Sequence, residues 1–288
     1  MLNILVTGAN GQLGNELRLL GAASPNRYIC TDVAELDITD ADAVEAFTAS
    51  RQIDVIVNCA AYTNVEKAEE DEATARKINC DAVRNLAEAA ARHGATLIHV
   101  STDYVFDGSG HIPYTEEMPA APLGAYGRTK RAGEEAVEAS GCRYLIFRTA
   151  WLYSEFGNNF VKTMLRLTAE RDTLNVVFDQ VGTPTYAADL AEAIFGIIER
   201  GACAGNEGIY HFTNEGVCSW YDFACEVAAA AGNNRCTIRP CRTWEYPVKA
   251  ARPAYSLLDK GKYKRTFGAA IPHWREALAR CIRKIQKA

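Results

Sequence analysis

The sequence of 288 residues lacks any run of about 18 apolar residues, the length that a membrane-spanning helix needs. Its first residues lack the basic stretch, apolar core and cleavage site of a secretion signal, so we expect none. Internal repeats, low-complexity segments and sustained heptads are also missing, which excludes solenoids and coiled coils. With 48% apolar and 23% charged residues, the chain is predicted to be a globular cytoplasmic protein.

Closely spaced cysteines of the kind that bind metals are missing as well. None of the ten cysteines forms a C-x-x-C pair, and the five histidines show no ligand spacing beside them. A zinc site is therefore not expected. Several cysteines lie in apolar stretches, which favours buried thiols in a reducing compartment.

The charge is unevenly distributed. The net charge is −5, yet residues 233–288 contain 14 basic and 3 acidic residues. This basic segment is either a local site for an anionic ligand or a solvated surface. Because the whole chain is acidic and shows no nucleic-acid-binding motif, we expect neither nucleic acid nor membrane as a partner.

Short apolar stretches alternate with helical patterns in the first half, as expected for parallel βαβ units. The expected strands are 2–7, 28–31, 54–58, 95–101 and 143–148, and the expected helices are 11–20, 40–50 and 73–93. Continuously apolar strands indicate a sheet that is covered on both faces. We therefore predict a doubly wound parallel α/β sheet of the Rossmann type, with residues 1–150 as a dinucleotide-binding domain.

The alternation weakens beyond residue 150. Helical patterns at 159–170, 187–200 and 219–231 are separated by short strands such as 208–212. We interpret residues 151–288 as a smaller α/β region that binds the substrate, and expect part of 172–212 to return to the first domain. The proline-containing stretch 107–124 is long for a connection inside a compact domain, which indicates a functional loop.

Three glycines with the spacing G-x-x-G-x-x-G follow the first strand and open the first helix. Such glycines allow a tight turn, a close approach of pyrophosphate to the backbone, and close packing of helix on strand. Free N–H groups at the helix start favour phosphates. An ordinary glycine-rich turn is the alternative. The residues predicted to bind a cofactor here are Gly8, Asn10, Gly11, Gln12, Leu13 and Gly14.

The ends of the next two strands extend this predicted cofactor site. Asp32 lies 24 residues beyond Gly8, where an acid accepts hydrogen bonds from an adenosine ribose. An acid there repels a 2′-phosphate and favours NADH over NADPH, although a simple turn cap is the alternative. Asp37 and Ile38 are expected to flank the adenine. Small residues after the third strand would let a cofactor lie against the backbone, in the segment Ala60, Ala61, Tyr62 and Thr63.

A second group of residues suits proton transfer. Tyr126 and Lys130 are four residues apart, so they share one helix face. An ammonium nearby lowers the pKa of a phenol and makes it a general acid/base near neutral pH. Thr102 ends the fourth strand and could hydrogen-bond the same substrate oxygen. A surface pair on a helix is the alternative for Tyr126 and Lys130 alone.

Together these motifs resemble the extended short-chain dehydrogenase/reductase family, and within it the reductases that act on dTDP-4-keto sugars. The resemblance covers nearly the whole chain. It rests on G-A-N-G-Q-L-G, N-C-A-A-Y-T-N-V-E-K-A-E, S-T-D-Y-V-F-D-G, Y-G-R-T-K, F-R-T-A-W-L-Y, G-N-N-F, G-T-P-T-Y and A-R-P-A-Y-S. It implies reduction of the 4-keto group of dTDP-4-dehydro-L-rhamnose to dTDP-L-rhamnose, with NADPH or NADH as cofactor.

The resemblance also implies roles for individual residues. Tyr126 would be the proton donor, Lys130 its modulator and Thr102 the hydroxyl partner. The residues implied to lie near the dTDP-sugar, with the last near its phosphates, are Thr102, Asp103, Trp151, Asn159 and Arg252. Arg252 falls within the basic segment described above.

Other activities on the same scaffold stay open at this point. A 4,6-dehydratase would need a glutamate after Asp103, where this chain has Tyr104. A 4-epimerase or another nucleotide-sugar reductase would use the same tyrosine. A regulatory subunit such as that of methionine adenosyltransferase resembles this family without being primarily an enzyme.

Some members of the resembled family hold Mg²⁺ between subunits through glutamates. Glu16 stands at the position in the first helix, but 187–190 reads Ala-Ala-Asp-Leu and no glutamate follows Glu276. We therefore predict no metal, with Glu16 as the one weak candidate and otherwise a helix-start acid. The protein is expected to be a monomer or a homodimer.

Overall fold

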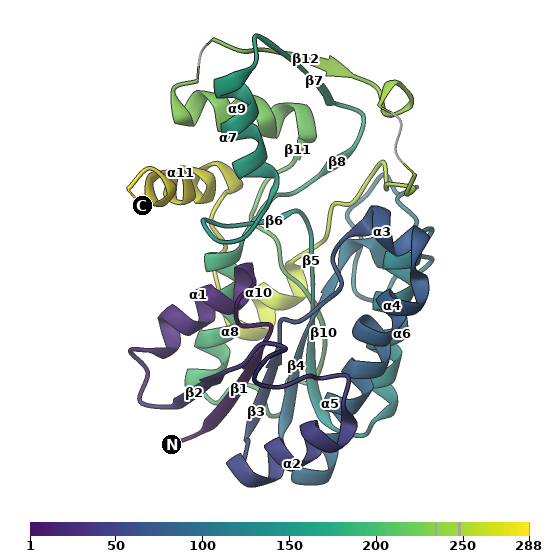
Figure 1. Cartoon of the computed structure of the whole chain (residues 1–288), viewed down its shortest axis with the longest axis vertical. Helices are drawn as coiled ribbons and strands as arrows, with labels where there is room; N and C mark the ends of the chain where they lie inside the picture. The colour runs from purple at the N-terminus through teal and green to yellow at the C-terminus, as the bar shows by residue number, and fades with distance from the viewer. Residues whose placement is uncertain (234, 247–248, 288) are drawn as a thin grey trace.

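A computed structural model describes residues 1–233, 235–246 and 249–287. A large sheet with helices on both faces forms one end of the molecule, and a smaller group of helices and short strands lies at the other (Figure 1). The α/β class predicted from the alternating pattern is confirmed.

The large sheet has six parallel strands in the order β10-β5-β4-β3-β1-β2. Because β1 pairs with both β2 and β3, the winding reverses there, and such sheets bind ligands at the carboxyl ends of the strands beside that point. The strands are β1 Asn3–Thr7, β2 Arg27–Cys30, β3 Val55–Asn58, β4 Thr96–Thr102, β5 Arg143–Thr149 and β10 Gly208–His211.

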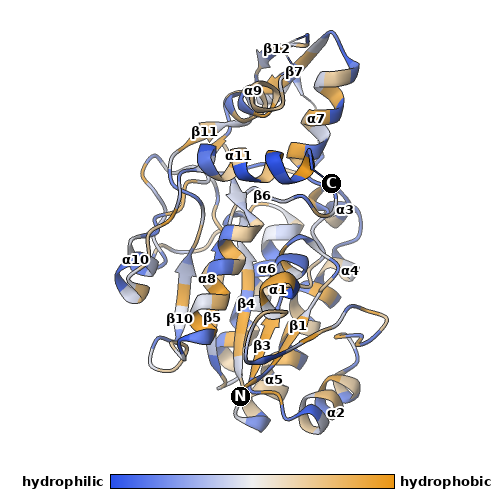
Figure 2. Ribbon diagram, turned by 90° about the vertical axis from the view of Figure 1, so that its left-hand side faces the viewer, coloured by the Kyte–Doolittle hydropathy of each residue, from blue (hydrophilic) through white to orange (hydrophobic). Residues whose placement is uncertain are grey.

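Alternate side chains of these strands enter two separate cores. Ile4 and Val6 pack with helices α1 and α8, whereas Leu5 packs with α2, α5 and α6 on the other face. Figure 2 shows the resulting apolar strands between the helical layers. The flanking helices are α1 Gln12–Gly21, α2 Ala41–Arg51, α3 Val65–Glu70, α4 Glu72–Arg76, α5 Ala82–His93, α6 Ala125–Ala139, α8 Ala187–Glu199 and α10 Gly261–Phe267.

Several helix ends follow the signals in the sequence. Asp40 caps α2 by accepting from the Ala43 N–H at 3.0 Å, and Gly94 ends α5 with φ +67°. The expectation of one helix over 73–93 is wrong, because a π-helical turn, η1 (Lys77–Asp81), interrupts it between α4 and α5.

That π turn positions Asn79 inside the molecule. The Asn79 side chain accepts from the Tyr62 N–H at 2.8 Å and donates to the Tyr62 carbonyl at 3.1 Å. It also donates to the Thr129 hydroxyl at 3.2 Å. The segment after β3 is thus joined to α6, which brings two parts of the predicted site together.

The smaller region has its own core of buried aromatic and aliphatic side chains, centred on Phe223, Trp274 and Tyr153. Two helices of this region begin at a capping side chain, because Asn159 caps α7 and Ser219 caps α9. The elements outside the large sheet are β6 Leu152–Tyr153, α7 Phe160–Glu170, β7 Thr173–Val177, β8 Val181–Gly182, β9 Thr185–Tyr186, β11 Cys218–Ser219, α9 Trp220–Ala231, β12 Thr237–Cys241, α11 Trp274–Ile285 and the short turns η2 Asp103–Val105 and η3 Thr243–Glu245.

Chain order and position differ in one stretch. Although α8 and β10 follow the first elements of the smaller region, α8 packs on α1 and β10 pairs with β5. The boundary at residue 150 and a substrate-binding role for the smaller region stay predictions. The stretch 107–124 connects η2 to α6 and pairs at Tyr114 with Leu258.

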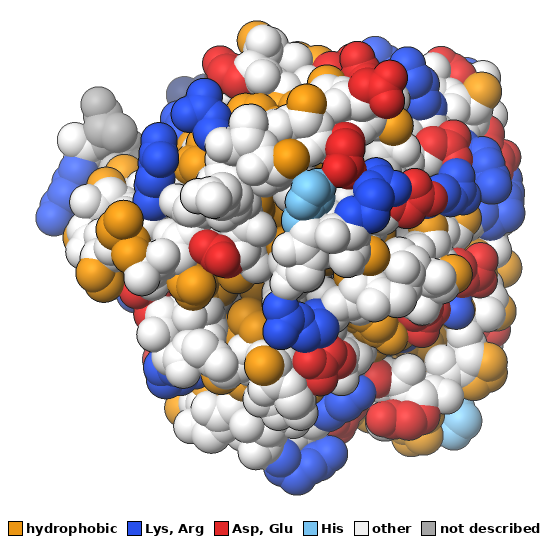
Figure 3. All heavy atoms as spheres, turned by 90° about the horizontal axis from the view of Figure 1, so that it is seen from below, with side chains coloured by type: hydrophobic (Ala, Val, Ile, Leu, Met, Phe, Trp, Pro, Cys, Tyr) orange, Lys and Arg blue, Asp and Glu red, His pale blue; other side chains and the backbone are white. Residues whose placement is uncertain are grey.

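The surface charges and the cysteines of the structure agree with what the composition indicates. Acidic and basic side chains are interspersed over the face seen from below, where the N-terminus and α2 lie (Figure 3). Among the described residues, none of the helices has the length and apolar character needed to cross a bilayer. All ten cysteines carry free thiols.

Candidate active site

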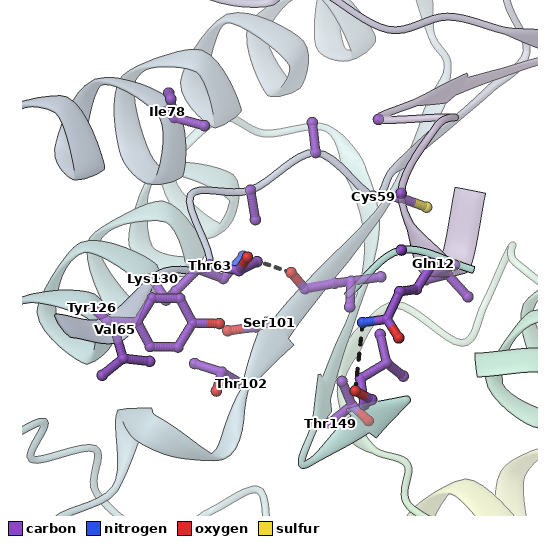
Figure 4. Close-up of a pocket in the computed structure, with 18 of the residues that line it drawn as sticks. Gln12, Cys59, Thr63, Val65, Ile78, Ser101, Thr102, Tyr126, Lys130 and Thr149 are labelled. Carbon is purple, nitrogen blue, oxygen red and sulfur yellow. Dashed lines mark hydrogen bonds between the residues drawn. The ribbon is translucent and has the colours of Figure 1, made fainter. Parts of the chain in front are cut away.

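A cavity of about 980 Å³ lies over the carboxyl ends of the sheet strands (Figure 4). Most predicted site residues line it: Gly8, Gly11, Gln12, Leu13, Asp32, Asp37, Ile38, Ala60, Ala61, Thr63, Thr102, Asp103, Tyr126, Lys130, Trp151, Asn159 and Arg252. Three predicted cofactor residues, Asn10, Gly14 and Tyr62, are not among its lining residues. The topology therefore gathers residues from both halves of the chain around one space.

The glycine turn is tightly built. Gly8 has φ +62°, and a Cβ there would lie 2.6 Å from the Ala60 backbone nitrogen. A Cβ on Gly14 would lie 2.4 Å from the Gly8 carbonyl oxygen. The expected turn and close helix packing are thus present, and Gly14 serves the packing from outside the cavity wall.

Gly8→Ala is expected to weaken NADPH binding by about tenfold or more, because the methyl group displaces the backbone at Ala60. The left-handed φ adds about 1–2 kcal/mol of destabilisation. Gly94→Ala is the matched control, because Gly94 has φ +67° with no atom within 4 Å of its added Cβ. Cofactor titration should separate the two variants. Equal NADPH affinity in both would contradict a cofactor site at the Gly8 turn.

Asp32 holds the turn closed. Its carboxylate accepts from the Asn10 N–H at 3.0 Å and from the Val33 N–H at 2.9 Å. The Asn10 side chain points elsewhere, since its oxygen accepts from Arg18 at 3.0 Å. Asp37 caps the next turn by accepting from the Thr39 N–H at 2.9 Å. These carboxylates line the cavity while they also stabilise the loops around it.

Tyr126 lies near the start of α6, and its hydroxyl points toward Ser101 and Thr102 at the end of β4 (Figure 4). Burial raises the pKa of Tyr126 to about 12, although a hydrogen bond from Thr102 opposes the rise. The expectation that Lys130 lowers this pKa is wrong for the protein without ligand, because burial outweighs any such effect. The phenol is therefore protonated at neutral pH, which suits a proton donor.

Thr102 and Asp103 form a buried pair beside Tyr126. The Thr102 hydroxyl donates to Asp103 Oδ1 at 2.9 Å and accepts from the Tyr104 N–H at 3.2 Å. Burial raises the pKa of Asp103 to about 6, against the hydrogen bond from Thr102. Because the Thr102 hydroxyl has one hydrogen, it donates at any moment either to Asp103 or to an acceptor beside Tyr126.

Lys130 lies one helical turn beyond Tyr126, with its side chain almost fully buried. Its ammonium donates to the Val100 carbonyl at 2.7 Å. Burial lowers the pKa of Lys130 to about 8, and the nearby Glu134 and Cys59 oppose this. A lysine with this pKa is charged at neutral pH and loses its charge in mildly alkaline solution.

Three further predicted residues, Trp151, Asn159 and Arg252, line the same cavity. Trp151 has φ +49° and stacks on Trp220 with ring centroids 3.5 Å apart. Arg252 donates to Glu66 at 3.1 Å, and its buried Nε has no partner among the described residues. The Asn159 amide donates to Gln12 at 3.1 Å, so it also ties α7 to the glycine turn.

Sequence reasoning missed other lining residues. Trp220 begins α9, and Ser101 precedes Thr102 on β4. Lys77 and Ile78 come from the π turn. A local pattern carries no signal for Trp220, whose place in the wall results from packing between distant segments. Ser101 could have been found, because it shares the strand end with Thr102.

Glu16, the weak candidate for a metal ligand, lies beside a second carboxylate and a lysine. Lys284 Nζ lies 2.8 Å from Glu155 and 3.8 Å from Glu16, so an ammonium already partners these carboxylates. Burial and then the charge of Glu155 raise the pKa of Glu16 to about 8. Within 1–233, 235–246 and 249–287, no group of three or more potential ligands could hold a metal ion. This cluster does not fit Mg²⁺, and the absence of a metal stays a prediction.

A glycine turn suited to phosphates thus faces a tyrosine and a lysine on one helix, across a single cavity at the reversal point of a parallel sheet. That combination is typical of short-chain dehydrogenases/reductases, and it places the chain in this class of nucleotide-binding oxidoreductases.

Residues 2–287 match the family model described as RmlD substrate binding domain, and the chain belongs to this family. The dTDP-4-dehydrorhamnose reductase of Aggregatibacter actinomycetemcomitans is 43% identical over 287 residues, covering 96% of this chain and 97% of the relative. A protein of Streptomyces antibioticus named probable dTDP-4,6-dihydroxy-2-methyloxan-3-one 4-ketoreductase is 43% identical over 277 residues, covering 95% and 92%.

Solved structures of relatives share this fold. The dTDP-4-dehydrorhamnose reductase of Clostridium acetobutylicum has a TM-score of 0.95 at 45% identity, covering 99% of this chain and 100% of that chain. The dTDP-4-dehydrorhamnose reductase of Bacillus anthracis in complex with NADP has a TM-score of 0.92 at 39% identity, with coverage of 99% and 100%.

Proposed function

We propose that this protein reduces the 4-keto group of dTDP-4-dehydro-L-rhamnose to the alcohol of dTDP-L-rhamnose, with NADPH or NADH as cofactor. The observation that carries the proposal is the single cavity in which Tyr126, Thr102 and Lys130 meet the glycine turn. Relatives of nearly the same length, at 43% and 45% identity, are named for this reaction.

The cavity suits a dinucleotide. The Gly8 turn leaves no space for a side chain between it and Ala60, as expected where a pyrophosphate lies against the backbone. When bound, the reduced nicotinamide supplies the hydride for the keto carbon. Lys130 would hold the ribose next to Tyr126 through its cavity-facing hydrogens.

Tyr126 would give its phenolic proton to the keto oxygen as negative charge develops there. Its high pKa keeps the phenol protonated before the substrate binds. Thr102 would turn its single hydroxyl hydrogen from Asp103 to the same oxygen and so donate to it. The sugar gains one hydride and one proton, which balances the conversion of ketone to alcohol.

The remaining substrate would extend toward the smaller region. Arg252 has an unpartnered buried Nε within the described residues, which supports a role in binding the diphosphate. Trp151 offers an aromatic surface to the sugar. Asn159 would line the same part, although its amide already bonds Gln12 and Ser154.

The test is to follow the ultraviolet absorbance of NADPH and NADH with enzymatically made dTDP-4-dehydro-L-rhamnose. We expect a loss of absorbance that requires both the sugar nucleotide and Tyr126. The same assay ranks the two cofactors and so tests the preference for NADH that Asp32 predicts. Absence of turnover while the cofactor still binds would contradict the proposal.

One alternative has a specific observation in its favour. The relative of Streptomyces antibioticus, equally 43% identical, carries the name of a 4-ketoreductase for a different dTDP sugar. Another dTDP-4-keto sugar is therefore the second candidate substrate, and parallel assays would discriminate. A 4-epimerase would retain its cofactor without net oxidation, and a regulatory subunit would show no turnover.

Two further points stay part of the proposal. A cytoplasmic location is supported by ten free thiols, which suit a reducing compartment. Monomer and homodimer both stay open as the state in solution.

A further inference from the structure

A row of buried, hydrogen-bonded polar side chains runs across strands β1, β3 and β4 and ends next to Lys130. Thr7 on β1 donates to the Asn58 oxygen on β3 at 2.7 Å, and the Ala60 N–H donates to the same oxygen at 3.1 Å. The Asn58 amide nitrogen lies 3.1 Å from Nδ1 of His99 on β4. Thr7, Asn58 and His99 are at most 1% exposed.

These contacts fix the tautomer of His99. A backbone N–H only donates, so the Asn58 atom that faces Ala60 must be the oxygen, and the atom that faces His99 must be the NH₂ group. Nδ1 of His99 therefore accepts. Burial, and then the charge of Lys130, hold the pKa of His99 well below its usual value, so the ring is neutral. Its one proton is on Nε2.

Nε2 of His99 lies 3.5 Å from Nζ of Lys130. Both groups are donors when the lysine is charged, so His99 offers the ammonium nothing to bind. The other ionisable groups around Lys130 are Glu134 and Tyr126 on its own helix and Cys59 after β3. The protein acceptor that bonds Lys130 is the Val100 carbonyl.

We propose that His99 is a positioning residue for the reduction, because its neutral ring turns an N–H toward Lys130 and so leaves the other ammonium hydrogens for a ligand in the cavity. The inference rests on the proposed function, in which Lys130 holds the cofactor ribose. It assigns a task to a fully buried histidine outside the cavity wall.

Two substitutions separate this task from packing. His99→Asn places an amide oxygen near the position of Nδ1, where it still accepts from Asn58, and leaves no group facing Lys130. His99→Gln places an amide oxygen near the position of Nε2, where it accepts from Lys130. His211→Gln is the matched control, because His211 is also 0% exposed in the same sheet and bonds the Tyr114 carbonyl at 3.0 Å instead.

The measurement is the Kd of NADPH across pH on the full-length protein, without sugar substrate. In the unsubstituted protein, affinity should fall as the pH rises through about 8, where Lys130 loses its charge. For His99→Gln we expect Kd at pH 7 to rise about tenfold, since an ammonium hydrogen is taken from the ligand. The pH at which this variant loses NADPH affinity should be higher by about half a pH unit or more, because an acceptor stabilises the charged lysine. His211→Gln should keep Kd within about twofold at pH 7, whereas His99→Asn should raise Kd, by less than His99→Gln does, because it removes the N–H that faces Lys130 without supplying an acceptor.

A second readout needs no variant. Nitrogen NMR of His99 in the unsubstituted protein should show a protonated Nε2 and a bare Nδ1. A protonated Nδ1 would overturn the inference, and so would a folded His99→Gln protein with the affinity and pH midpoint of the unsubstituted protein. Because neither readout uses the keto sugar, a failure of the proposed reaction would show separately, as absence of turnover.

Discussion

Tyr126→Phe is expected to lower kcat by about 10²–10⁴-fold, the usual contribution of a positioned general acid. The phenol is half-buried and lines the cavity, and its pKa of about 12 keeps it protonated at neutral pH. Removing the hydroxyl removes the proton and leaves the ring in place. The Kd of NADPH should therefore change by less than about threefold.

The same experiment needs a control for the loss of a hydroxyl from a half-buried tyrosine. Tyr144 is also half-buried, lies on β5 and does not line the cavity, so Tyr144→Phe should keep full turnover. Substantial turnover of Tyr126→Phe would show that the proton comes from elsewhere, and the role given to Tyr126 would be wrong.

Glu134→Ala is expected to lower the free energy of unfolding by about 3–5 kcal/mol, because it leaves a buried cation without its partner. Glu134 and Arg148 are both at most 2% exposed and form two hydrogen bonds, at 2.9 and 2.7 Å. Arg148 already has one buried nitrogen without a partner among the described residues. Urea unfolding measures the loss.

Glu135→Ala is the matched control, one residue further along the helix. Its side chain is 60% exposed and bonds Arg131 at 3.2 Å, so we expect a loss of about 1 kcal/mol or less. Replacing both buried partners, Glu134 by Leu and Arg148 by Met, should recover much of the loss. Equal losses for Glu134→Ala and Glu135→Ala would contradict the account of the buried pair.

The pair also predicts a dependence on pH. Burial raises the pKa of Glu134, but hydrogen bonds and charge from Arg148 outweigh it and hold this pKa below its usual value. Its contribution to stability is therefore complete above the ordinary pKa of glutamate and is lost as the pH falls through the folded value. Glu134→Ala should lack this part of the acid dependence.

Much of the fold could be predicted because its signals are local. A glycine turn after an apolar strand, a cap at Asp40 and a glycine after His93 are each defined by a few neighbouring residues. Parallel strands bring their carboxyl ends to one edge, so Thr102 and the glycine turn could be placed together without any knowledge of their distance. For these two parts of the site, the order and direction of the strands were enough.

The π turn at Lys77–Asp81 could not be predicted in the same way. Its residues are compatible with an ordinary helix, and the extra residue is accommodated by packing that the sequence does not display. A Cβ on Gly133 would lie 2.1 Å from the Asn79 carbonyl, so close contact with α6 accompanies the turn. The placement of Asn79 against Tyr62 follows from that contact.

The protonation of the site was also beyond local patterns. The spacing of Tyr126 and Lys130 predicts a lowered phenol pKa, yet burial raises the pKa of Tyr126 and lowers the pKa of Lys130. The partners of Lys130 come from β4, which precedes it by about thirty residues, and the Trp220 wall comes from the smaller region. Burial and tertiary neighbours, not spacing, decide these properties.

The most direct test of the central claim is to follow the hydrogen that arrives at the sugar. The protein should be given dTDP-4-dehydro-L-rhamnose and NADPH carrying deuterium at the transferred position of the nicotinamide. We predict dTDP-L-rhamnose with one deuterium at C4, formed in equal amount to the oxidised cofactor and dependent on Tyr126. A product without deuterium, or unchanged keto sugar while the cofactor remains bound, would contradict the account.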